Sequence, residues 1–297
     1  MHSTPSETRN EEKPLTTFIG LGAMGFPMAG HLSKAGFDVT LFNRTQSKAD
    51  VWLEQYNGQK STSITQAVKN ADIVFSCVGN DNDVREIYTE IFKTVPTGAI
   101  LVDHTTTSAQ LARELAAIAK QKELTFIDAP VSGGQVGAEQ GTLTIMAGGD
   151  KISFNKIVPI INHYAKAVTL IGDVGAGQTC KMVNQLCVAG VLQGLSEGLN
   201  LAKSSGINAE TILNVLQYGA ASSWQMVNRT ETMMNDEFDF GFAIDWMRKD
   251  LAICFDEAEK LGIELPMSKL IDKRYAKLQE KGYGRSDTSA LIKQFDI

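Results

Sequence analysis

The chain has 297 residues, of which 43% are hydrophobic and 21% are charged, and its formal net charge is −6 at pH 7. This length is typical of two domains with ample chain to bury a core. The sequence contains no block of like charge, which argues against a nucleic-acid-binding or membrane-surface protein. It also contains no apolar run of the roughly 18 residues that a membrane span needs.

The first 13 residues are polar and include Glu7, Glu11 and Glu12. They fit neither a secretory signal nor an Arg-rich, acid-poor transit peptide, so we expect a disordered tail at 1–13. The four cysteines lack the spacing of metal ligands and are expected to be reduced thiols of a cytoplasmic protein without a metal. They are Cys77, Cys180, Cys187 and Cys254.

Strand and helix patterns then alternate up to about residue 172. Strands are predicted at 16–19, 38–42, 72–78, 99–102, 125–128, 142–147 and 167–171, and helices at 25–35, 47–55, 82–92, 108–122 and 152–164. This alternation is typical of a doubly wound, largely parallel α/β sheet. We therefore predict a Rossmann-type dinucleotide-binding domain over residues 14–176.

After Gly177 the strand patterns stop. Helices are predicted at 178–205, 209–217, 223–235, 244–261, 267–281 and 288–295. Gly206 and Gly262 stand where a glycine commonly ends a helix. Residues 177–297 are therefore predicted to form an all-α domain for substrate binding and oligomerisation.

A glycine motif, Gly20-Leu21-Gly22-Ala23-Met24-Gly25, links the first strand to the first helix. Gly20 permits a tight turn, Gly22 allows the backbone to approach a pyrophosphate, and Gly25 allows close helix–strand packing. The pyrophosphate is expected at the helix N-terminus. The alternative is a glycine-rich turn without a ligand, but the strand–turn–helix context favours dinucleotide binding.

The second strand is followed by Asn43-Arg44-Thr45. Enzymes that prefer NAD usually have an acidic residue here, which binds the ribose 2′-hydroxyl. Asn43 is neutral, and Arg44 can pair with a 2′-phosphate through charge-assisted hydrogen bonds. The pattern favours NADP, with NAD possible, although Arg44 could also be an ordinary solvated loop residue.

A second glycine-rich loop, Ser132-Gly133-Gly134, follows the strand that ends at Asp128. Ligands bind at the carboxyl ends of strands in open α/β sheets. The Ser132 hydroxyl and the flexible amides could hold an anion, although glycines needed only for turns would explain the loop equally simply.

Lys181 and Asn184 lie just after Gly175-Ala176-Gly177 on a helix of apolar and small residues. Residues i and i+3 share a helix face, so the ammonium and the carboxamide can address one small molecule. The simpler alternative is that Lys181 extends to solvent and Asn184 packs between helices.

In order, the glycine motif, the stretch from Asp128 to Gly134, the segment from Gly177 to Asn184, and Lys249-Asp250-Leu251 resemble the β-hydroxyacid dehydrogenase family. The resemblance extends from Leu15 onward. It implies that Lys181 is catalytic, that Asn184 orients the substrate, and that Ser132, Gly133 and Gly134 hold its carboxylate. It also implies that Lys249 reaches the cofactor side of the cleft and that Thr106 touches the nicotinamide end.

Read without the resemblance, Lys249 would be a solvated residue paired with Asp245. Two departures from the family pattern lie at the expected nicotinamide ribose: Val78-Gly79, where relatives often have Leu-Pro or Met-Pro, and His104-Thr105-Thr106. They weaken the predicted cofactor contacts of Val78, Gly79 and Thr106. His104, at a strand end, is expected to be a structural hydrogen-bonding residue.

The family implies an NADP(H)-dependent oxidoreductase that interconverts a small β-hydroxy acid and its semialdehyde or oxo acid by hydride transfer. Lys181 would be the general acid and base. A homodimer or homotetramer is expected. Two alternatives are an imine reductase of the same fold and a non-catalytic nucleotide-binding scaffold. Trp224, Phe242 and Trp246 are expected either to shape the substrate pocket or to pack in the core.

Overall fold

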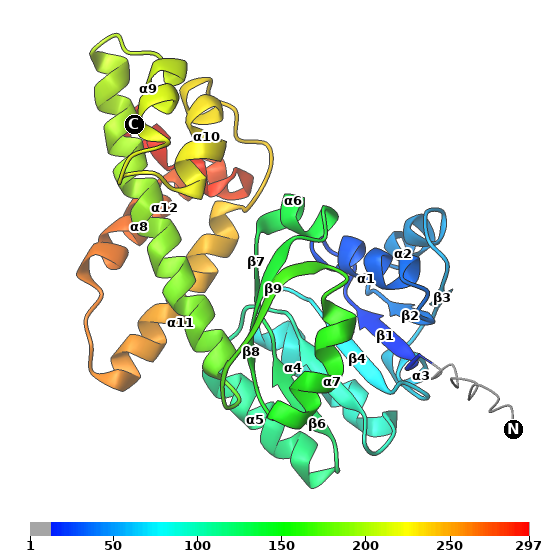
Figure 1. The fold of residues 1–297 in the computed structure, drawn as a ribbon. Helices are drawn as coiled ribbons and strands as arrows, with labels where there is room; N and C mark the ends of the chain where they lie inside the picture. Colours follow the sequence, from blue (N-terminus) through cyan, green and yellow to red (C-terminus); the bar gives the residue numbers. More distant parts are fainter. Residues whose placement is uncertain (1–12, 297) are drawn as a thin grey trace, which may run out of the picture.

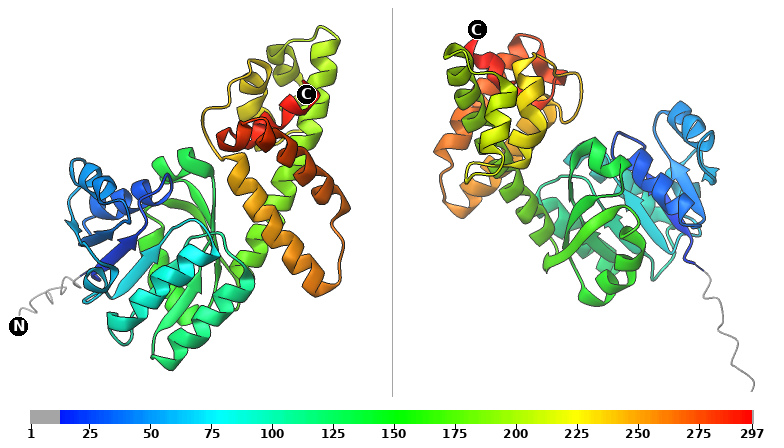
Figure 2. Two further views of the ribbon diagram at one scale, coloured as in Figure 1. Left: turned by 180° about the vertical axis from the view of Figure 1, so that it is seen from behind. Right: turned by 45° about the horizontal axis from the view of Figure 1, so that its top comes forward.

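The computed structural model describes residues 13–296, which form an α/β domain and a helical domain joined through one long helix (Figure 1). The predicted tail falls almost entirely outside these residues. Figure 2 shows from two further directions that the helical domain sits at one end of the α/β domain. Within residues 13–296, no helix is both long and apolar enough to cross a membrane.

The α/β domain is built on one nine-stranded sheet in the order β3-β2-β1-β4-β5-β6-β8-β7, with β9 paired to β8. The pairs among β1 to β6 are parallel, whereas β8 is antiparallel to β6 and β7. The strand order reverses between β1 and β4, the position where ligands bind in doubly wound sheets. The strands are β1 (Thr16–Ile19), β2 (Val39–Phe42), β3 (Gln59–Lys60), β4 (Ile73–Ser76), β5 (Ile100–Asp103), β6 (Thr125–Asp128), β7 (Val131–Ser132), β8 (Leu143–Gly148) and β9 (Ala165–Gly172).

Helices cover both faces of this sheet, because successive strand residues point to opposite sides. On β4, Phe75 packs in one apolar cluster with α1 and α7, whereas Val74 packs in a second cluster with α4 and α5. Both side chains are fully buried. The helices are α1 (Gly25–Lys34), α2 (Gln46–Leu53), α3 (Ile64–Ala67), α4 (Asp81–Thr94), α5 (Ala109–Gln121), α6 (Gly134–Glu139) and α7 (Lys151–Ile161).

The helical domain packs around α8 (Ala176–Ser204), which begins on the sheet and runs the length of the domain (Figure 1). Its core includes Leu192 and Leu199 of α8, Leu251 of α11 and Tyr275 of α12. The other elements are α9 (Ala209–Leu216), α10 (Trp224–Met234), α11 (Ile244–Leu261), α12 (Pro266–Glu280) and the 3₁₀ segments Tyr283–Arg285 and Thr288–Phe295.

Every predicted strand and helix is present within a few residues of its expected ends, except that Thr288–Phe295 is 3₁₀ rather than α-helical. Gly262 ends α11 in the left-handed conformation, and Gly206 follows α8 with φ of 76°. Five short elements, β3, β7, α3, α6 and the 3₁₀ segment Tyr283–Arg285, were not predicted. Each has six residues or fewer, which is too short for a periodic hydrophobic pattern.

Candidate functional site

The glycine motif forms the turn between β1 and α1, and its glycines are explained by close contacts. Gly20 has φ of 96°, and a Cβ there would overlap the Cys77 carbonyl. A Cβ on Gly25 would overlap the Gly20 carbonyl, whereas one on Gly22 would meet no atom within 4 Å. Helix α1 begins without a side-chain cap. The open backbone at Gly22 and the uncapped amides suit a pyrophosphate.

The Asn43 side chain connects this turn to the end of β2 through hydrogen bonds. Its Oδ1 accepts a hydrogen bond from Leu21 N at 2.8 Å, and its Nδ2 donates to Thr45 O at 2.9 Å. The Arg44 side chain is 85% exposed, and its guanidinium lies 3.6 Å from Asp83 Oδ1. Arg44 is therefore at the edge of the glycine motif and can turn toward a ligand there.

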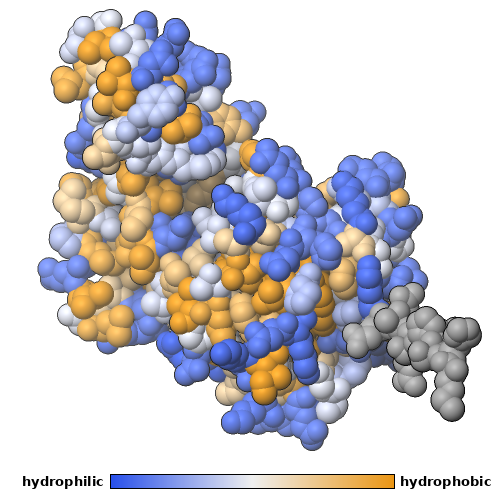
Figure 3. All heavy atoms as spheres, viewed as in Figure 1, coloured by the Kyte–Doolittle hydropathy of each residue, from blue (hydrophilic) through white to orange (hydrophobic). Residues whose placement is uncertain are grey.

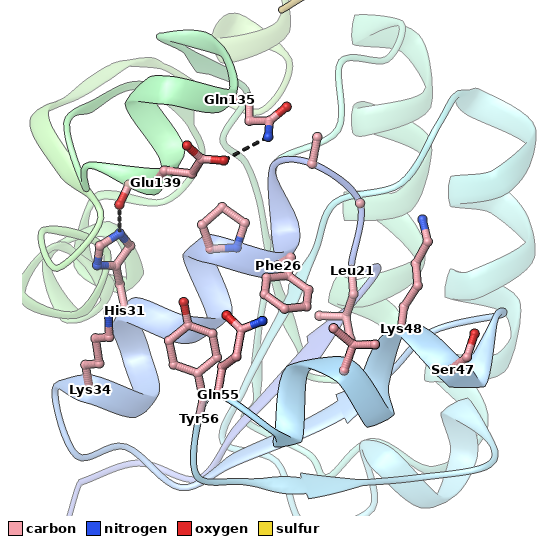
Figure 4. Close-up of a pocket in the computed structure, with 14 residues that line it drawn as sticks. Leu21, Phe26, His31, Lys34, Ser47, Lys48, Gln55, Tyr56, Gln135 and Glu139 are labelled. Atoms are coloured by element: carbon pink, nitrogen blue, oxygen red, sulfur yellow. Dashed lines mark hydrogen bonds between the residues drawn. The ribbon is translucent and has the colours of Figure 1, made fainter. Parts of the chain in front are cut away.

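A groove of about 560 Å³ begins at the glycine motif and runs between α1, α2 and α6 (Figure 4). Lys48 and Ser47, at the start of α2, line it beside Leu21. His31 Nε2 crosses to α6, where it lies 3.0 Å from Ala138 O and 3.1 Å from Glu139 O. Lys48 was not predicted as a cofactor-binding residue. Its position four residues after Arg44 could have indicated it, because it places a second cation near the predicted binding site for the 2′-phosphate.

Lys249 contacts two other predicted cofactor residues. Its ammonium donates to Thr106 O at 2.7 Å and to Gly79 O at 3.2 Å. It also lies 2.9 Å from Asp250 Oδ1, so its ionic partner is Asp250 and not Asp245, which instead accepts a hydrogen bond from Gln279. The solvated reading of Lys249 was wrong, because the side chain bridges from α11 to the ends of β4 and β5. Val78 N donates to Thr105 Oγ1 at 3.0 Å in the same region.

Lys181 is buried near the start of α8. The pKa of its ammonium is lowered to about 8, mainly by burial; the negative charge of Asp250 opposes this shift, and the positive charge of Lys249 adds to it. A lysine with a pKa near 8 can both donate and accept a proton close to neutral pH.

Asn184 links the second glycine-rich loop to α11 through a chain of polar contacts. Ser132 Oγ donates to Asn184 Oδ1 at 3.3 Å, and Asn184 Nδ2 donates to Gln185 Oε1 at 2.7 Å. Gln185 Nε2 then donates to Asp250 Oδ2 at 2.6 Å. Gln185 and Asp250 were not predicted as site residues, although a carboxylate among the apolar positions of α11 is a signal that Asp250 is paired in the interior.

The loop after β7 has an irregular backbone that favours glycine. Gly133 and Gly134 have φ of 130° and 62°, a region that L-residues rarely adopt. The two glycines place this irregular turn next to the Ser132 hydroxyl, and irregular turns of this kind can bind anions through backbone amides. In the space-filling view, the surface is hollowed between the two domains beside α6, which follows this loop (Figure 3).

Asp128, at the end of β6, accepts hydrogen bonds from the backbone at the beginning of α8. Its Oδ1 accepts from Gly175 N at 2.7 Å and its Oδ2 from Gln178 N at 2.8 Å. Burial raises the pKa of this carboxyl to about 6, while the hydrogen bonds from Gly175 and Gln178 act to lower it. A Cβ on Gly177 would collide with the backbone of Met146 and Asp128, which explains the glycine at this contact.

His104 is structural, as predicted. It is buried, with Nδ1 2.7 Å from Ala129 O and Nε2 2.9 Å from Tyr164 Oη. Burial lowers the pKa of its imidazole to about 4, so the ring is neutral at physiological pH. No group of three or more His, Cys, Asp or Glu side chains in residues 13–296 is arranged to hold a metal ion.

Of the three aromatic residues considered for the pocket, Trp246 lies at the site. Its ring lies 3.5 Å from where a Gly79 Cβ would be, and its centroid is 5.9 Å from Lys249 Nζ. Trp224 instead stacks on Arg229, with 4.9 Å between the ring centroid and the guanidinium carbon, and Phe242 packs against the helical core.

Comparison with known proteins shows the family to which the chain belongs. Residues 16–172 match the family described as the NAD binding domain of 6-phosphogluconate dehydrogenase, and residues 175–295 match the family described as NAD-binding of NADP-dependent 3-hydroxyisobutyrate dehydrogenase. An uncharacterized oxidoreductase of Shewanella frigidimarina is 53% identical over 94% of this chain and 97% of its own length.

A 2-(hydroxymethyl)glutarate dehydrogenase of Eubacterium barkeri is 33% identical over 94% of each chain. The solved structure of Mycobacterium tuberculosis 3-hydroxyisobutyrate dehydrogenase with L-serine has a TM-score of 0.87 and 28% identity, covering 96% of this chain and 99% of that one. The chain therefore belongs to the 3-hydroxyisobutyrate dehydrogenase-type, or β-hydroxyacid dehydrogenase, family of NAD(P)-dependent oxidoreductases.

Proposed function

We propose that this oxidoreductase interconverts a small carboxylated β-hydroxy acid and its semialdehyde or oxo acid, with Lys181 as the general acid and base. The observation that carries the proposal is the burial of Lys181 one helical turn from Asn184, at the end of the sheet where the glycine motif lies. The nicotinamide cofactor supplies the hydride acceptor or donor.

In the reductive direction, the Lys181 ammonium hydrogen-bonds the substrate carbonyl oxygen, stabilises its developing negative charge and donates the proton. In the oxidative direction, the neutral amine accepts the hydroxyl proton. The lowered pKa of Lys181, about 8, makes both forms available near neutral pH. Asn184, held by Ser132 and Gln185, orients the substrate next to the lysine.

Asp250 supports this machinery without touching the substrate. It pairs with Lys249 at 2.9 Å and accepts from Gln185 at 2.6 Å. Its negative charge raises the pKa of Lys181, which offsets part of the effect of burial. Asp250 thus connects the proton-transfer side of the site to the cofactor side.

The proposed carboxylate site is the turn formed by Ser132, Gly133 and Gly134. The positive φ angles of the two glycines and the neighbouring hydroxyl support it. The names of related proteins are consistent with an acid group, because 2-(hydroxymethyl)glutarate and L-serine each carry a hydroxymethyl group and a carboxylate.

Succinic semialdehyde and glyoxylate should have higher kcat/KM than butyraldehyde and acetaldehyde. Each charge-assisted hydrogen bond to the carboxylate should strengthen binding by about 10–100-fold. Loss of the carboxylate should also lower kcat, because its binding orients the carbonyl against Lys181. Steady-state kinetics over this panel test the expectation. Gly133→Val should reduce the difference in kcat/KM between the carboxylated and the plain aldehydes. The control is Gly219→Val, in an exposed loop, which should leave this difference unchanged. Equal kcat/KM values for the two classes of aldehyde in the wild-type protein would contradict a carboxylate site.

Replacing Lys181 should remove proton transfer while the cofactor still binds. Lys181→Ala is expected to lower kcat by roughly 10²–10⁴-fold. The control is Lys203→Ala, an exposed lysine in the last turn of the same helix. Near-native kcat in Lys181→Ala, with cofactor affinity measured in parallel by fluorescence titration, would refute the assigned role.

The pH dependence gives a second readout of the same role. The ammonium form is needed for reduction, so kcat/KM of reduction should fall as pH rises above about 8, the pKa of Lys181. The neutral form is needed for oxidation, so kcat/KM of oxidation should rise up to that pH and then level off. Both profiles should lose this inflection in Lys181→Ala.

We further propose that NADP(H) is preferred over NAD(H). The residues that support this preference are the neutral Asn43, the 85% exposed Arg44 and the nearby Lys48, which together offer two cations and no acid at the end of β2. NAD remains a possible cofactor because Asn43 Oδ1 faces the glycine motif much as a carboxylate oxygen would.

The double change Asn43→Asp with Arg44→Leu should shift the preference from NADPH toward NADH. One charge-assisted hydrogen bond corresponds to about 1.5–3 kcal/mol, or on the order of 10–100-fold in NADPH affinity. Dissociation constants of both cofactors should be compared with those of Arg85→Leu, which removes an arginine paired with Glu114 on the surface. A wild-type protein that binds NADH more tightly would overturn the preference.

Imine reduction and a non-catalytic scaffold remain the alternatives. The presence of Lys181 argues against the imine reductases of this fold, in which we expect another residue at that position. The substrate panel separates these readings, because turnover of cyclic imines but of no carbonyl acid would favour an imine reductase, and no turnover at all would favour a scaffold.

We also propose that two copies of the chain associate through α8. An exposed stripe of apolar and small residues follows one face of this helix, and Figure 3 shows hydrophobic side chains over this part of the helical domain. Nothing lies within 4 Å of a Cβ placed on its glycines, so a second helix could approach closely. Such patches are typical of protein interfaces, and a stripe on one helix can pair with itself. The stripe comprises Val183, Cys187, Gly190, Val191, Gly194, Gly198 and Leu201.

Light scattering should therefore give a mass of two or four chains for the wild-type protein. Gly194→Arg places a long cation in the stripe and is expected to shift the mass toward one chain. Gln121→Arg, at the exposed end of α5, is the control and should leave the mass unchanged. A wild-type protein with the mass of a single chain would rule out this interface.

A further inference from the structure

We propose that Gln178 is a positioning residue that holds the cofactor-side loop 105–107 at a fixed distance from Lys181. The inference rests on the proposed function, because it concerns the geometry of the same reaction. It assigns a role to a fully buried amide for which the chemistry described above has no use.

Gln178 bonds the loop with both ends of its side chain. Its Oε1 accepts from Thr107 N at 3.0 Å, and its Nε2 donates to Thr105 O at 2.7 Å. The residue between them, Thr106, is the one that receives the Lys249 ammonium on its carbonyl at 2.7 Å. The loop is therefore clamped on both sides by the helical domain, by α8 through Gln178 and by α11 through Lys249.

Gln178 is itself held firmly. Its backbone N–H donates to Asp128 Oδ2 at 2.8 Å, which fixes the first turn of α8 to the end of β6. Lys181 lies three residues further along the same helix, about one turn away. A single rigid helical turn thus carries both the proton donor and the clamp on the loop beside the cofactor.

The clamp requires an amide. One side-chain atom must accept a hydrogen bond from a backbone N–H and the other must donate to a backbone carbonyl. Methionine has a similar size but offers neither bond, and it would leave the Thr107 N–H and the Thr105 carbonyl without their partner. An ionised carboxylate can accept but cannot donate, so it would repel the Thr105 carbonyl.

Relaxing the clamp should slow hydride transfer more than it weakens binding. A misplacement of about 1 Å can cost on the order of 10²-fold in rate. In single-turnover experiments with reduced cofactor and succinic semialdehyde, Gln178→Met should lower the rate constant by roughly 10–100-fold. C4-deuterated cofactor identifies the observed step as hydride transfer. Cofactor affinity, measured by fluorescence titration, should change by less than about threefold.

Gln193→Met is a matched control. Gln193 is also buried on α8, but it bonds Glu197 and Gln294 more than three helical turns beyond Lys181. This variant should lower the melting temperature about as much as Gln178→Met does, while the rate of hydride transfer in the folded protein stays native. Equal rates in the two variants, both near native, would overturn the inference.

Gln178→Glu distinguishes the clamp from simple packing. A protonated carboxyl can donate to Thr105 O and accept from Thr107 N, whereas the carboxylate cannot donate. The neighbouring ionisable groups are Asp128, bonded to the same residue's backbone, Asp103, bonded to Thr105 N, and Lys181. Burial and the two acids favour the protonated form, while the Lys181 ammonium favours the carboxylate, so we expect the rate relative to wild type to rise as the pH falls from 8 to 6.

The outcomes separate the inference from the function on which it rests. If Lys181→Ala is impaired while Gln178→Met transfers hydride at the native rate, the positioning role is wrong and the proposed function stands. If wild-type protein reduces none of the carboxylated carbonyl compounds, the proposed function fails and the inference fails with it. A rate ratio for Gln178→Glu that is flat with pH would also contradict the clamp.

Discussion

The attachment of α8 to the end of β6 is the contact on which the rest of the site depends. Asp128 accepts two backbone hydrogen bonds from the first turn of the helix, at 2.7 and 2.8 Å. Gly177 lets the helix backbone lie directly against the strand, because any side chain there would collide with Met146 and Asp128. The helix therefore starts inside the α/β domain and continues as the core of the helical domain. Lys181 owes its burial between the two domains to this contact.

Burial is the main cause of the lowered pKa of Lys181, and the two charges beside it change this pKa in opposite directions. Lys249 lowers its pKa and Asp250 raises it, and these two residues are themselves an ion pair at 2.9 Å. The same pair reaches the loops after β4 and β5 through Lys249 and reaches Asn184 through Gln185. The second glycine-rich loop, Asn184 and the loops after β4 and β5 are thereby connected by one continuous set of polar contacts.

The sequence was sufficient to predict features that depend on periodic hydrophobic patterns or on short local motifs. The alternation of strands and helices gave the α/β domain, and the glycine motif lies at the turn where it was expected, between β1 and α1. Lys181 and Asn184 were predicted as a pair because i and i+3 share a helix face, and both lie on α8. The resemblance to a family was needed for Lys249, since spacing alone paired it with Asp245.

What could not be predicted depends on contacts between segments far apart in the chain. Gln178 is 71 and 73 residues from the two backbone groups it bonds, and Gln185 is 65 residues from Asp250. No periodic pattern encodes such pairs. The 3₁₀ conformation of Thr288–Phe295 is similarly set by packing against α8 and α12, where tertiary contacts override the helical propensity of a short segment.

The most direct measurement is a crystal structure of the protein with oxidised cofactor and a bound hydroxy acid. We expect Lys181 Nζ within hydrogen-bond distance, about 2.6–3.2 Å, of the substrate hydroxyl, and the carboxylate at Ser132, Gly133 and Gly134. The Gln178 bonds to Thr105 and Thr107 should be retained. A substrate bound with its hydroxyl away from Lys181, or with its carboxylate on another group, would contradict the central claim that this buried lysine is the acid and base of the reaction.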